Sequence, residues 1–371
     1  MKTPKIAIVC DWLTDWGGAE RVILAMHRLF PEAPIYTSLY NASNLPQFDK
    51  VDVRPSYLQR IPGAYRHHQR FIAQMPGAFE SFDLSEFDIV LSSSHSFAKG
   101  VVTKPETMHV SYCHSPPRYL WDNFHQYVDQ YPWPKILKRL VIPKILHNLR
   151  IWDRAAADRV DLYIANSRFI TNRIRKYYRR ESTVIYPPVE MSEFEAVEKD
   201  DYFLAVGRLI PYKRFDLIID TFNELKLPLK VIGLGNQFKT LQKKANDNIE
   251  FLGKVPEEEL RRYYRYAKAL IFPQIEDFGI TPVEAMAYGC PVIAYKGGGA
   301  LETVKDKVSG LFFEEQTVDA LKGAVLKFQQ SIFDPYKVRE QAETFHEDVF
   351  TEALGHYLEE EWAKWLSSIN Q

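Results

Sequence analysis

The sequence has few cysteines, and they are not grouped. Cys10, Cys113 and Cys290 lie far apart in the chain of 371 residues. This spacing excludes a Cys-x-x-Cys zinc or redox pair. We therefore predict that all three are buried free thiols of a protein that works in a reducing compartment.

Long apolar runs are also missing. The run Ile6–Val9, which follows Met-Lys-Thr-Pro-Lys, is far shorter than the core of a signal peptide. No stretch approaches the ~20 apolar residues of a spanning helix. We expect a cytoplasmic protein whose contact with a membrane, if it has one, is peripheral.

The chain has almost no net charge. Its 47 Lys and Arg residues nearly balance 48 Asp and Glu residues, which leaves a formal charge of -1. A balanced chain has no global field that attracts nucleic acid, so no nucleic-acid partner is expected. With 46% hydrophobic and 26% charged residues, the sequence predicts a folded protein, and its length favours two domains.

Short apolar runs alternate with helical patterns in both halves. In the N-terminal half we predict strands at 5–9, 88–91, 109–113 and 162–165, with a helical pattern at 19–30. In the second half we predict strands at 202–206, 229–232, 249–252, 269–272 and 291–294, with helices at 215–225, 257–267 and 282–288. This alternation is typical of parallel sheets with crossover helices, so the predicted fold is α/β with two doubly wound, Rossmann-like domains.

The expected domain boundary lies at the two prolines of Tyr186-Pro187-Pro188-Val189, because proline resists both helix and strand. The end of the chain is predicted to be helical, with one apolar face made of Phe345, Phe350, Leu354, Leu358 and Trp362. Ligands of open α/β sheets bind beyond the C-terminal ends of the strands, so two such domains that face each other would form a cleft.

The most informative segment runs from Glu276 to Ala294 and follows a predicted strand. Thr281 is a plausible N-cap and Pro282 suits the first helical position. The free amides of such a terminus can bind an anion. Glu276, in the loop, could accept hydrogen bonds from sugar hydroxyls, and Glu284, placed in the first turn, could hold the hydroxyls of a ribose. Taken alone, Glu284 is better explained as a residue placed to suit the helix dipole.

A second segment brings cations to the end of a strand. Arg208 and Lys213 follow Gly207, which allows close backbone approach. Cations placed there would stabilise a diphosphate leaving group as it gains charge. Two solvated surface charges are the alternative, and Arg214 is more readily explained in that way.

Two further loops follow strands of the N-terminal half. Gly17 and Gly18 could approach a phosphate or a sugar through their amides, although a Gly-Gly pair alone indicates only a tight turn. His114 precedes two prolines that would stiffen its loop, so its imidazole could point into the cleft. His95 is a weaker candidate on the acceptor side, and Arg118 is another.

These segments together resemble the family 4 glycosyltransferases, which have the two-domain GT-B fold. The spacing of Glu276 and Glu284 is similar to the E-x7-E element of that family, and Gly207-Arg208 with Lys213 is similar to its G-R-x5-K element. The resemblance implies an N-terminal acceptor domain (1–187, completed by a C-terminal helix at about 346–371) and a C-terminal donor domain (188–345). It implies catalytic roles for His114, Arg208, Lys213 and Glu276, and donor contacts from Gly17, Gly18, Gly207, Phe278, Gly279, Ile280, Thr281 and Glu284.

The run from Cys113 to Asp122 looks like a subset of bacterial enzymes that build O-antigen and exopolysaccharide chains, often mannosyltransferases. This resemblance implies mannose as the transferred sugar, with GDP-mannose as the nucleotide sugar. The family resemblance over nearly the whole chain implies transfer with retention of anomeric configuration, and the basic segments described below lead us to expect a lipid-linked oligosaccharide as the acceptor. The metal-binding Asp-x-Asp signature of the other major glycosyltransferase fold does not occur, so no metal and no cofactor are expected.

Other functions stay open at this point. The same fold could use a UDP-sugar, or the protein could be a non-catalytic sugar-binding subunit of a polysaccharide assembly complex. An NAD-linked oxidoreductase is disfavoured, because Gly233-Leu-Gly235 lacks the third glycine of a dinucleotide fingerprint: position 238 is Phe.

Three basic segments lie in the N-terminal half, at 54–75, 135–159 and 168–180. In the second, cations alternate with apolar and aromatic residues, and Trp133 immediately precedes it. Such a mixture suits the surface of an anionic leaflet, so we predict peripheral binding at the inner face of the cell membrane. An amphipathic core helix with a solvated basic face is the alternative.

Overall fold

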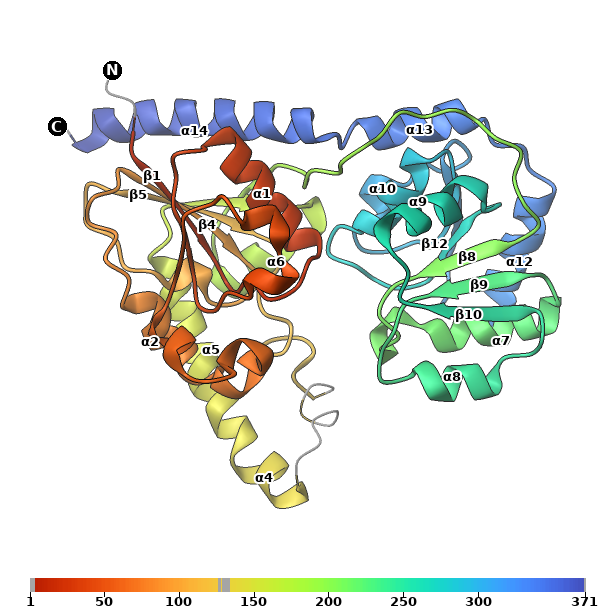
Figure 1. Cartoon of the computed structure of the whole chain (residues 1–371), viewed down its shortest axis with the longest axis horizontal. Helices are drawn as coiled ribbons and strands as arrows, with labels where there is room; N and C mark the ends of the chain where they lie inside the picture. The colour runs from red at the N-terminus through yellow and green to blue at the C-terminus, as the bar shows by residue number, and fades with distance from the viewer. Residues whose placement is uncertain (1–3, 126–127, 129–133, 370–371) are drawn as a thin grey trace. The chain divides into compact units, whose positions relative to one another are not determined.

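The computed structural model describes residues 4–125, 128 and 134–369, and these form two compact units (Figure 1). The first unit comprises Met1–Pro188 and Phe350–Gln371, and the second comprises Val189–Val349. Each unit is an α/β domain with one parallel sheet, which confirms the predicted fold class.

The sheet of the first unit has seven parallel strands in the order β3-β2-β1-β4-β5-β6-β7. The strands are β1 (Ile6–Cys10), β2 (Ile35–Thr37), β3 (Val53–Pro55), β4 (Ile89–Ser94), β5 (Met108–Cys113), β6 (Leu162–Ala165) and β7 (Thr183–Val184). The sequence predicted β1, β4, β5 and β6. The others were missed because strands of two or three residues are too short to show a hydrophobic period.

The helices of the first unit are α1 (Gly18–Leu29), α2 (Met75–Glu80), α4 (Lys135–Leu140), α5 (Ile142–Asp158), α6 (Arg168–Tyr178) and α14 (Glu347–Ile369), the last of which starts in the second unit. Short 3-10 turns η1 to η6 span Ala42–Asn44, Pro46–Phe48, Tyr57–Arg60, Ala64–Arg66, His68–Phe71 and Ala98–Gly100.

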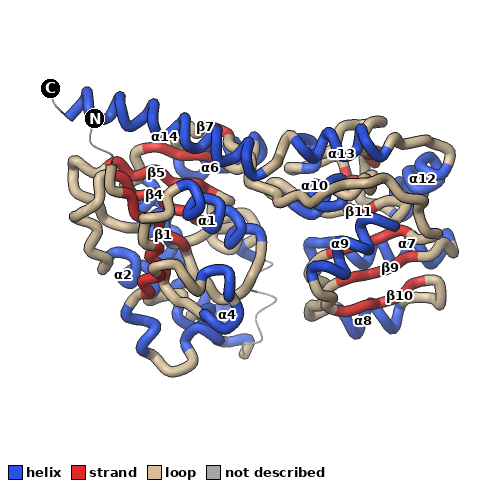
Figure 2. The backbone as a smooth tube through the Cα atoms, turned by 45° about the horizontal axis from the view of Figure 1, so that its top comes forward, coloured by secondary structure: helices blue, strands red, loops and turns tan. Residues whose placement is uncertain are grey.

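The second unit repeats this topology with six parallel strands in the order β10-β9-β8-β11-β12-β13. The strands are β8 (Phe203–Val206), β9 (Leu229–Ile232), β10 (Ile249–Gly253), β11 (Leu270–Phe272), β12 (Val292–Tyr295) and β13 (Gly310–Phe313), and η7 spans Pro211–Lys213. The helices are α7 (Phe215–Leu225), α8 (Phe238–Lys244), α9 (Glu257–Tyr266), α10 (Ile280–Ala287), α11 (Ala300–Thr303), α12 (Val318–Gln329) and α13 (Pro335–Glu343). Figure 2 shows these strands flanked by helices.

The C-terminal helix α14 completes the core of the first unit. Phe350, Leu354 and Leu358 are buried against residues of β1, β4 and β5, and Trp362 packs beside them. Phe345, which we predicted on the same face, lies before the helix and packs instead on Phe278 of the second unit, with ring centroids 5.3 Å apart. The helix begins only at residue 347, so the helical period does not extend back to Phe345.

Candidate functional site

Polar residues gather in both units where the strand order reverses. In the first unit β1 lies between β2 and β4, and in the second β8 lies between β9 and β11. Asp11 and His95 follow β1 and β4, while Arg208 and Glu276 follow β8 and β11. The crevice at such a reversal is where doubly wound folds bind ligands.

In the second unit, Lys213 and Glu276 form an ion pair between Nζ and Oε1. Their side chains are 14% and 17% exposed, so water screens this pair only in part. Burial alone would lower the pKa of Lys213, but the charge of Glu276 outweighs it and raises that pKa. Lys213 therefore stays a cation, held beside the loop that follows β11.

Backbone packing fixes the loop that carries Glu276. A Cβ at Gly298 would lie 2.5 Å from the Glu276 carbonyl oxygen, and one at Gly299 would lie 2.2 Å from that of Phe278. The Gly299 amide also donates to the Glu276 carbonyl, at 2.9 Å. A second glycine loop, at 297–299, thus packs closely against the backbone of the loop that carries Glu276. This loop was not among the predicted site segments, although three consecutive glycines were visible in the sequence.

The helix after this loop begins earlier than predicted. Its N-cap is Gly279, with φ at +90°, and its first residue is Ile280, so Thr281 is not the cap and Pro282 is the third helical residue. Glycine takes this left-handed conformation without the strain that threonine would meet there. Glu284 consequently lies in the second turn, where its carboxylate accepts a hydrogen bond from the Tyr264 hydroxyl at 3.3 Å.

The predicted donor residues near this terminus differ in exposure. Phe278 is 3% exposed and belongs to the core, so only its backbone could contact a ligand. Ile280, Thr281 and Glu284 are partly exposed. Gly207 has φ at +152°, and a Cβ at the neighbouring Gly233 would lie 1.9 Å from its carbonyl oxygen. Gly233 is therefore required for the packing of two strand ends.

In the first unit, the Asp11 carboxylate organises the loop after β4. It accepts hydrogen bonds from the backbone amides of His95 (2.6 Å), Ser96 (3.0 Å), Phe97 and Ala98 (2.8 Å). Asp11 Oδ2 also lies 3.0 Å from His95 Nδ1. Asp11 is 1% exposed, and burial alone would raise its pKa, but these donors hold that pKa below its usual value. Asp11 was not predicted as a site residue, and its position directly after the first strand is the signal that could have identified it.

The predicted histidines of the first unit converge. The rings of His95 and His114 lie 6.4 Å apart, and His114 Nε2 lies 2.8 Å from the Ser93 hydroxyl. Burial, followed by the charge of His95, lowers the pKa of His114 to about 3, so His114 is a neutral imidazole at physiological pH. Arg118 lies four residues further along the same loop and is partly exposed.

The glycine loop opens α1 as predicted. Gly17 is the N-cap and Gly18 the first helical residue. A Cβ at Gly17 would lie 3.1 Å from the Glu20 Oε2 atom, so a larger residue would press on that carboxyl. Glu20 is 8% exposed, and burial raises its pKa to about 7. Glu20 was not predicted as a site residue. The only signal in the sequence that could have identified it is its position in the first turn of the helix.

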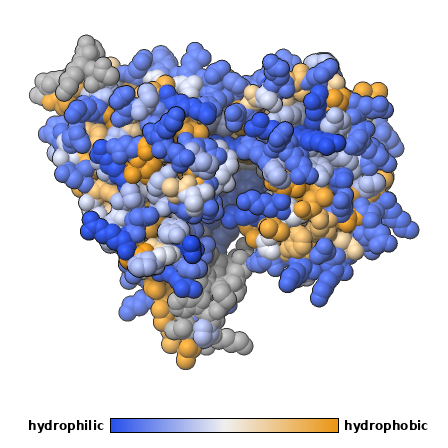
Figure 3. Space-filling view, in the orientation of Figure 1, coloured by the Kyte–Doolittle hydropathy of each residue, from blue (hydrophilic) through white to orange (hydrophobic). Residues whose placement is uncertain are grey.

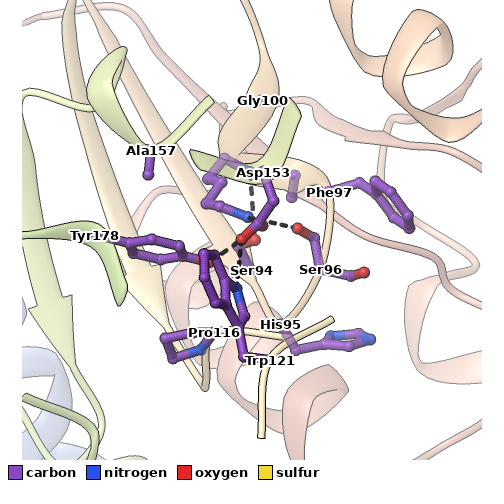
Figure 4. Close-up of polar contacts among 12 residues, drawn as sticks. Ser94, His95, Ser96, Phe97, Gly100, Pro116, Trp121, Asp153, Ala157 and Tyr178 are labelled. Atoms are coloured by element: carbon purple, nitrogen blue, oxygen red, sulfur yellow. Dashed lines mark hydrogen bonds and ion pairs between the residues drawn. The ribbon is translucent and has the colours of Figure 1, made fainter. Parts of the chain in front are cut away.

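The buried ion pair of Lys99 and Asp153 contacts both the loop that carries His95 and the loop that carries His114. Lys99 is 1% and Asp153 0% exposed, and the Lys99 ammonium donates to Asp153 Oδ1 at 2.5 Å and to the Ser96 carbonyl at 2.6 Å. Trp121 Nε1 donates to Asp153 Oδ2 at 2.9 Å, and the Tyr178 hydroxyl donates to Oδ1 at 3.2 Å. Figure 4 shows Trp121 and Tyr178 beside Asp153, with the His95 ring directed away from them. The loops after β4 and β5 are thereby tied to α5 and α6.

Two family models match the chain. "Glycosyltransferase Family 4" matches residues 16–193, and "Glycosyl transferases group 1" matches residues 189–344. Among solved structures, an Anabaena protein, HepE, in complex with UDP and glucose has a TM-score of 0.70 at 17% identity, over 96% of this chain and 100% of the other. Sucrose-phosphate synthase from Thermosynechococcus elongatus also has a TM-score of 0.70, at 16% identity, over 98% and 100% of the two chains. The fold is that of the GT-B glycosyltransferases.

Curated relatives match mostly over part of their length. The O-antigen chain mannosyltransferase RfbU of Salmonella typhimurium is 36% identical over 33% of this chain and 39% of its own. A GDP-mannose-dependent phosphatidylinositol monomannoside mannosyltransferase of Mycolicibacterium smegmatis is 33% identical over 33% and 37%. Mannosylfructose-phosphate synthase of Agrobacterium fabrum is 25% identical over 80% and 75%. The chain spans only about two fifths of the length of the two mannosyltransferases, and 52% of another relative that is 30% identical to it.

The two family models overlap at residues 189–193 and together match residues 16–344. By these matches, this chain belongs to the family 4 glycosyltransferases.

Proposed function

We propose that the protein is a retaining glycosyltransferase that transfers mannose from GDP-mannose to a lipid-linked oligosaccharide during the synthesis of a cell-surface polysaccharide. The observation that carries the proposal is the partly buried Lys213–Glu276 pair at the strand reversal of the second unit. A cation and a carboxylate side by side suit a ligand that presents a diphosphate next to sugar hydroxyls.

Each residue has a defined task in this proposal. Lys213 and Arg208 neutralise the charge that collects on the nucleoside diphosphate as the glycosidic bond breaks. Glu276 accepts hydrogen bonds from hydroxyls of the transferred sugar, and Glu284 from the ribose. The amides at the start of α10 and of α1 add donors without net charge. Gly17 and Gly18 stand at the start of α1 and Gly279 at the start of α10, where they add no side chain beside these amides.

Mannose is favoured by the partial relatives, of which two are mannosyltransferases that are 33% and 36% identical. One of them acts on a phosphatidylinositol mannoside, which is a lipid-borne acceptor. For this chain a lipid-linked acceptor is consistent with the exposed apolar residues of α4 and α5 in the first unit. Ile136 is 69% and Leu140 65% exposed, and orange side chains mark the lower end of this unit in Figure 3.

The structure narrows the surface that could contact a membrane. Leu149 is buried, and Ile145 and Trp152 pack against the core, so the inner face of α5 is occupied. In the segment 168–180, Arg173 pairs with Asp122 and Arg175 with Glu181, which reduces its positive charge. Arg60, Arg66, Arg70 and Lys144 remain exposed. Trp133 lies outside the described residues.

Within the described residues, no helix has the length and apolar character that spanning a membrane demands. The proposal assigns peripheral contact to the exposed residues of α4, α5 and the 54–75 segment, at the inner face of the cell membrane, because these residues combine cations with apolar side chains.

A thermal-shift screen tests the donor. The purified protein is heated with GDP, UDP or ADP and with the corresponding sugars, and the melting temperature is recorded. A nucleotide at 100 times its dissociation constant stabilises the folded state by about 2.7 kcal/mol, which such a screen detects. Stabilisation by GDP and GDP-mannose supports the proposal. A shift confined to UDP compounds assigns a UDP-sugar instead, and no shift with any nucleotide contradicts a donor site.

A further inference from the structure

Arg214 has a backbone conformation that is rare for arginine. It caps both η7 and α7, and its φ of +56° lies in the left-handed region. A residue with a side chain is strained there, whereas glycine is not. Such strain persists where neighbouring contacts hold the residue in place. Because Lys213 directly precedes Arg214, this strained turn lies next to a cation of the proposed donor site.

The Arg214 side chain makes contacts that hold the turn. It is 31% exposed and is not the solvated charge that the sequence favoured. Its Nη1 donates to Gln316 Oε1 and its Nε to Asp216 Oδ1, both at 3.3 Å. Gln316, which lies between β13 and α12, donates from Nε2 to the Pro273 carbonyl at 2.6 Å. Pro273 directly follows β11, at the start of the loop that carries Glu276.

Two links therefore join the loop after β8 to the loop after β11. One is the ion pair of Lys213 with Glu276. The other is the pair of hydrogen bonds that runs from Arg214 through Gln316 to the backbone after β11, which we call the Arg214–Gln316 bridge. A bound diphosphate would compete with Glu276 for the charge of Lys213. The bridge uses neither of these side chains, so it stays intact when the ion pair is weakened.

We propose that Arg214 and Gln316 are positioning residues of the donor site, and that their bridge keeps Lys213 and Glu276 at a fixed spacing when a nucleoside diphosphate binds. The inference rests on the proposed function, because it takes the phosphates to be the ligand of Lys213. It concerns the second unit alone. A cation that is held in place before the ligand arrives binds it at a smaller entropic cost. The bridge thus raises the affinity for the diphosphate and leaves the affinity for the nucleoside unchanged.

A direct contact between Arg214 and the phosphates is the alternative. Two nitrogens of Arg214 already donate to Asp216 and Gln316, which directs the guanidinium toward these residues. If Arg214 acted directly, loss of Gln316 would leave diphosphate binding intact, because the charge of Arg214 remains. In a bridge, loss of either residue has the same consequence.

The test uses Arg214→Gly, Gln316→Leu and the double variant. Glycine accepts the left-handed backbone, so Arg214→Gly removes the side chain and keeps the turn. Gln316→Leu removes both hydrogen bonds of the amide and leaves the charge of Arg214 in place. The matched control is Lys226→Gly, which removes an exposed cation with φ at +55° from the other end of α7.

Calorimetry measures the binding of GDP and of guanosine to each protein, or of UDP and uridine if the thermal-shift screen assigns a UDP-sugar. We expect each single variant to bind the diphosphate about 3- to 10-fold more weakly, as for the loss of one hydrogen bond, and to bind the nucleoside like the wild type. The double variant should bind no more weakly than the single variants, because each of them breaks the same bridge. Lys226→Gly should bind both ligands like the wild type.

The outcomes separate the bridge from the proposed function. An equal loss of affinity for diphosphate and nucleoside shows a role in folding alone and overturns the inference. Wild-type diphosphate binding by Gln316→Leu overturns it as well, and so do additive losses in the double variant. If Arg214→Gly does not fold, the comparison of the two ligands in Gln316→Leu decides by itself. A wild-type protein that binds no nucleotide contradicts the proposed function and the inference together.

Discussion

At the scale of single residues, the Lys213–Glu276 pair is a partly buried ion pair within the proposed donor site. Both side chains are more than four-fifths buried, and each lies near the end of a strand that borders the reversal of the sheet. The two charges compensate each other across the pair. A bound nucleoside diphosphate would offer Lys213 a second anion, and the sugar would offer Glu276 its hydroxyls.

We predict that Arg208→Ala, Lys213→Ala and Glu276→Ala each lower kcat by about 100- to 1,000-fold, because one contact to developing charge commonly contributes about 2.7–4 kcal/mol. Steady-state kinetics with the donor found in the screen provides the measurement. Lys243→Ala, which removes an exposed cation of α8, is the control and should keep its rate.

Circular dichroism of each variant distinguishes lost catalysis from lost folding. Wild-type rates in folded Lys213→Ala and Arg208→Ala proteins would contradict the assignment of these cations to the phosphates.

At the scale of elements, Lys99 and Asp153 join the loop after β4 to α5. Both are fully buried, so removing one leaves the other as an uncompensated charge in the core. Asp153→Leu or Lys99→Met alone should lower the free energy of unfolding of the first unit by about 3–5 kcal/mol. The double variant Lys99→Met with Asp153→Leu should lose clearly less than the sum of the two. Urea unfolding followed by fluorescence measures all three.

The control for this prediction is Arg154→Met, which breaks the exposed pair with Asp158 on the same helix. Exposed pairs contribute at most about 1 kcal/mol, so this variant should remain close to the wild type. Additive losses in the double variant would show that the buried pair has no energetic coupling.

At the scale of the whole molecule, the first prediction concerns the membrane. The wild-type protein should float with anionic liposomes at low salt and dissociate at high salt, because each cation near the surface contributes about 1 kcal/mol and salt screens it. Ile136→Ser with Leu140→Ser should reduce flotation. Ile332→Ser, which changes an isoleucine that is 99% exposed on the second unit, should not.

Equal and weak flotation with anionic and neutral vesicles at low salt would refute membrane binding and favour a soluble acceptor.

The second prediction at this scale concerns the reaction. Transfer should continue in excess EDTA, and an α-linked donor should give an α-linked product, which NMR of the purified product can establish. A strict requirement for added Mn²⁺, or an inverted product, would speak against the proposed mechanism.

Much of this organisation was accessible from the sequence. Runs of buried residues identify strands because burial on both faces requires continuous apolar side chains. The strands of four or more residues were therefore predicted to within a few residues, except β13, which was missed, and α7 was predicted with its observed bounds. The motif around Glu276 and Glu284 and the one at Gly207-Arg208 with Lys213 are local in sequence, which is why the sequence alone could indicate a glycosyltransferase.

Contacts between distant residues were decided only by the tertiary structure. Asp11 and His95 are 84 residues apart, and they meet because β1 pairs with β4 rather than only with strands nearer in sequence. Lys213 meets Glu276 because β8 pairs with β11. The N-cap of α10 is Gly279 because a left-handed residue could form there, although Thr281-Pro282 is the stronger local signal. Which strands pair depends on the packing of the whole sheet, so a local pattern of side chains cannot predict the pairing.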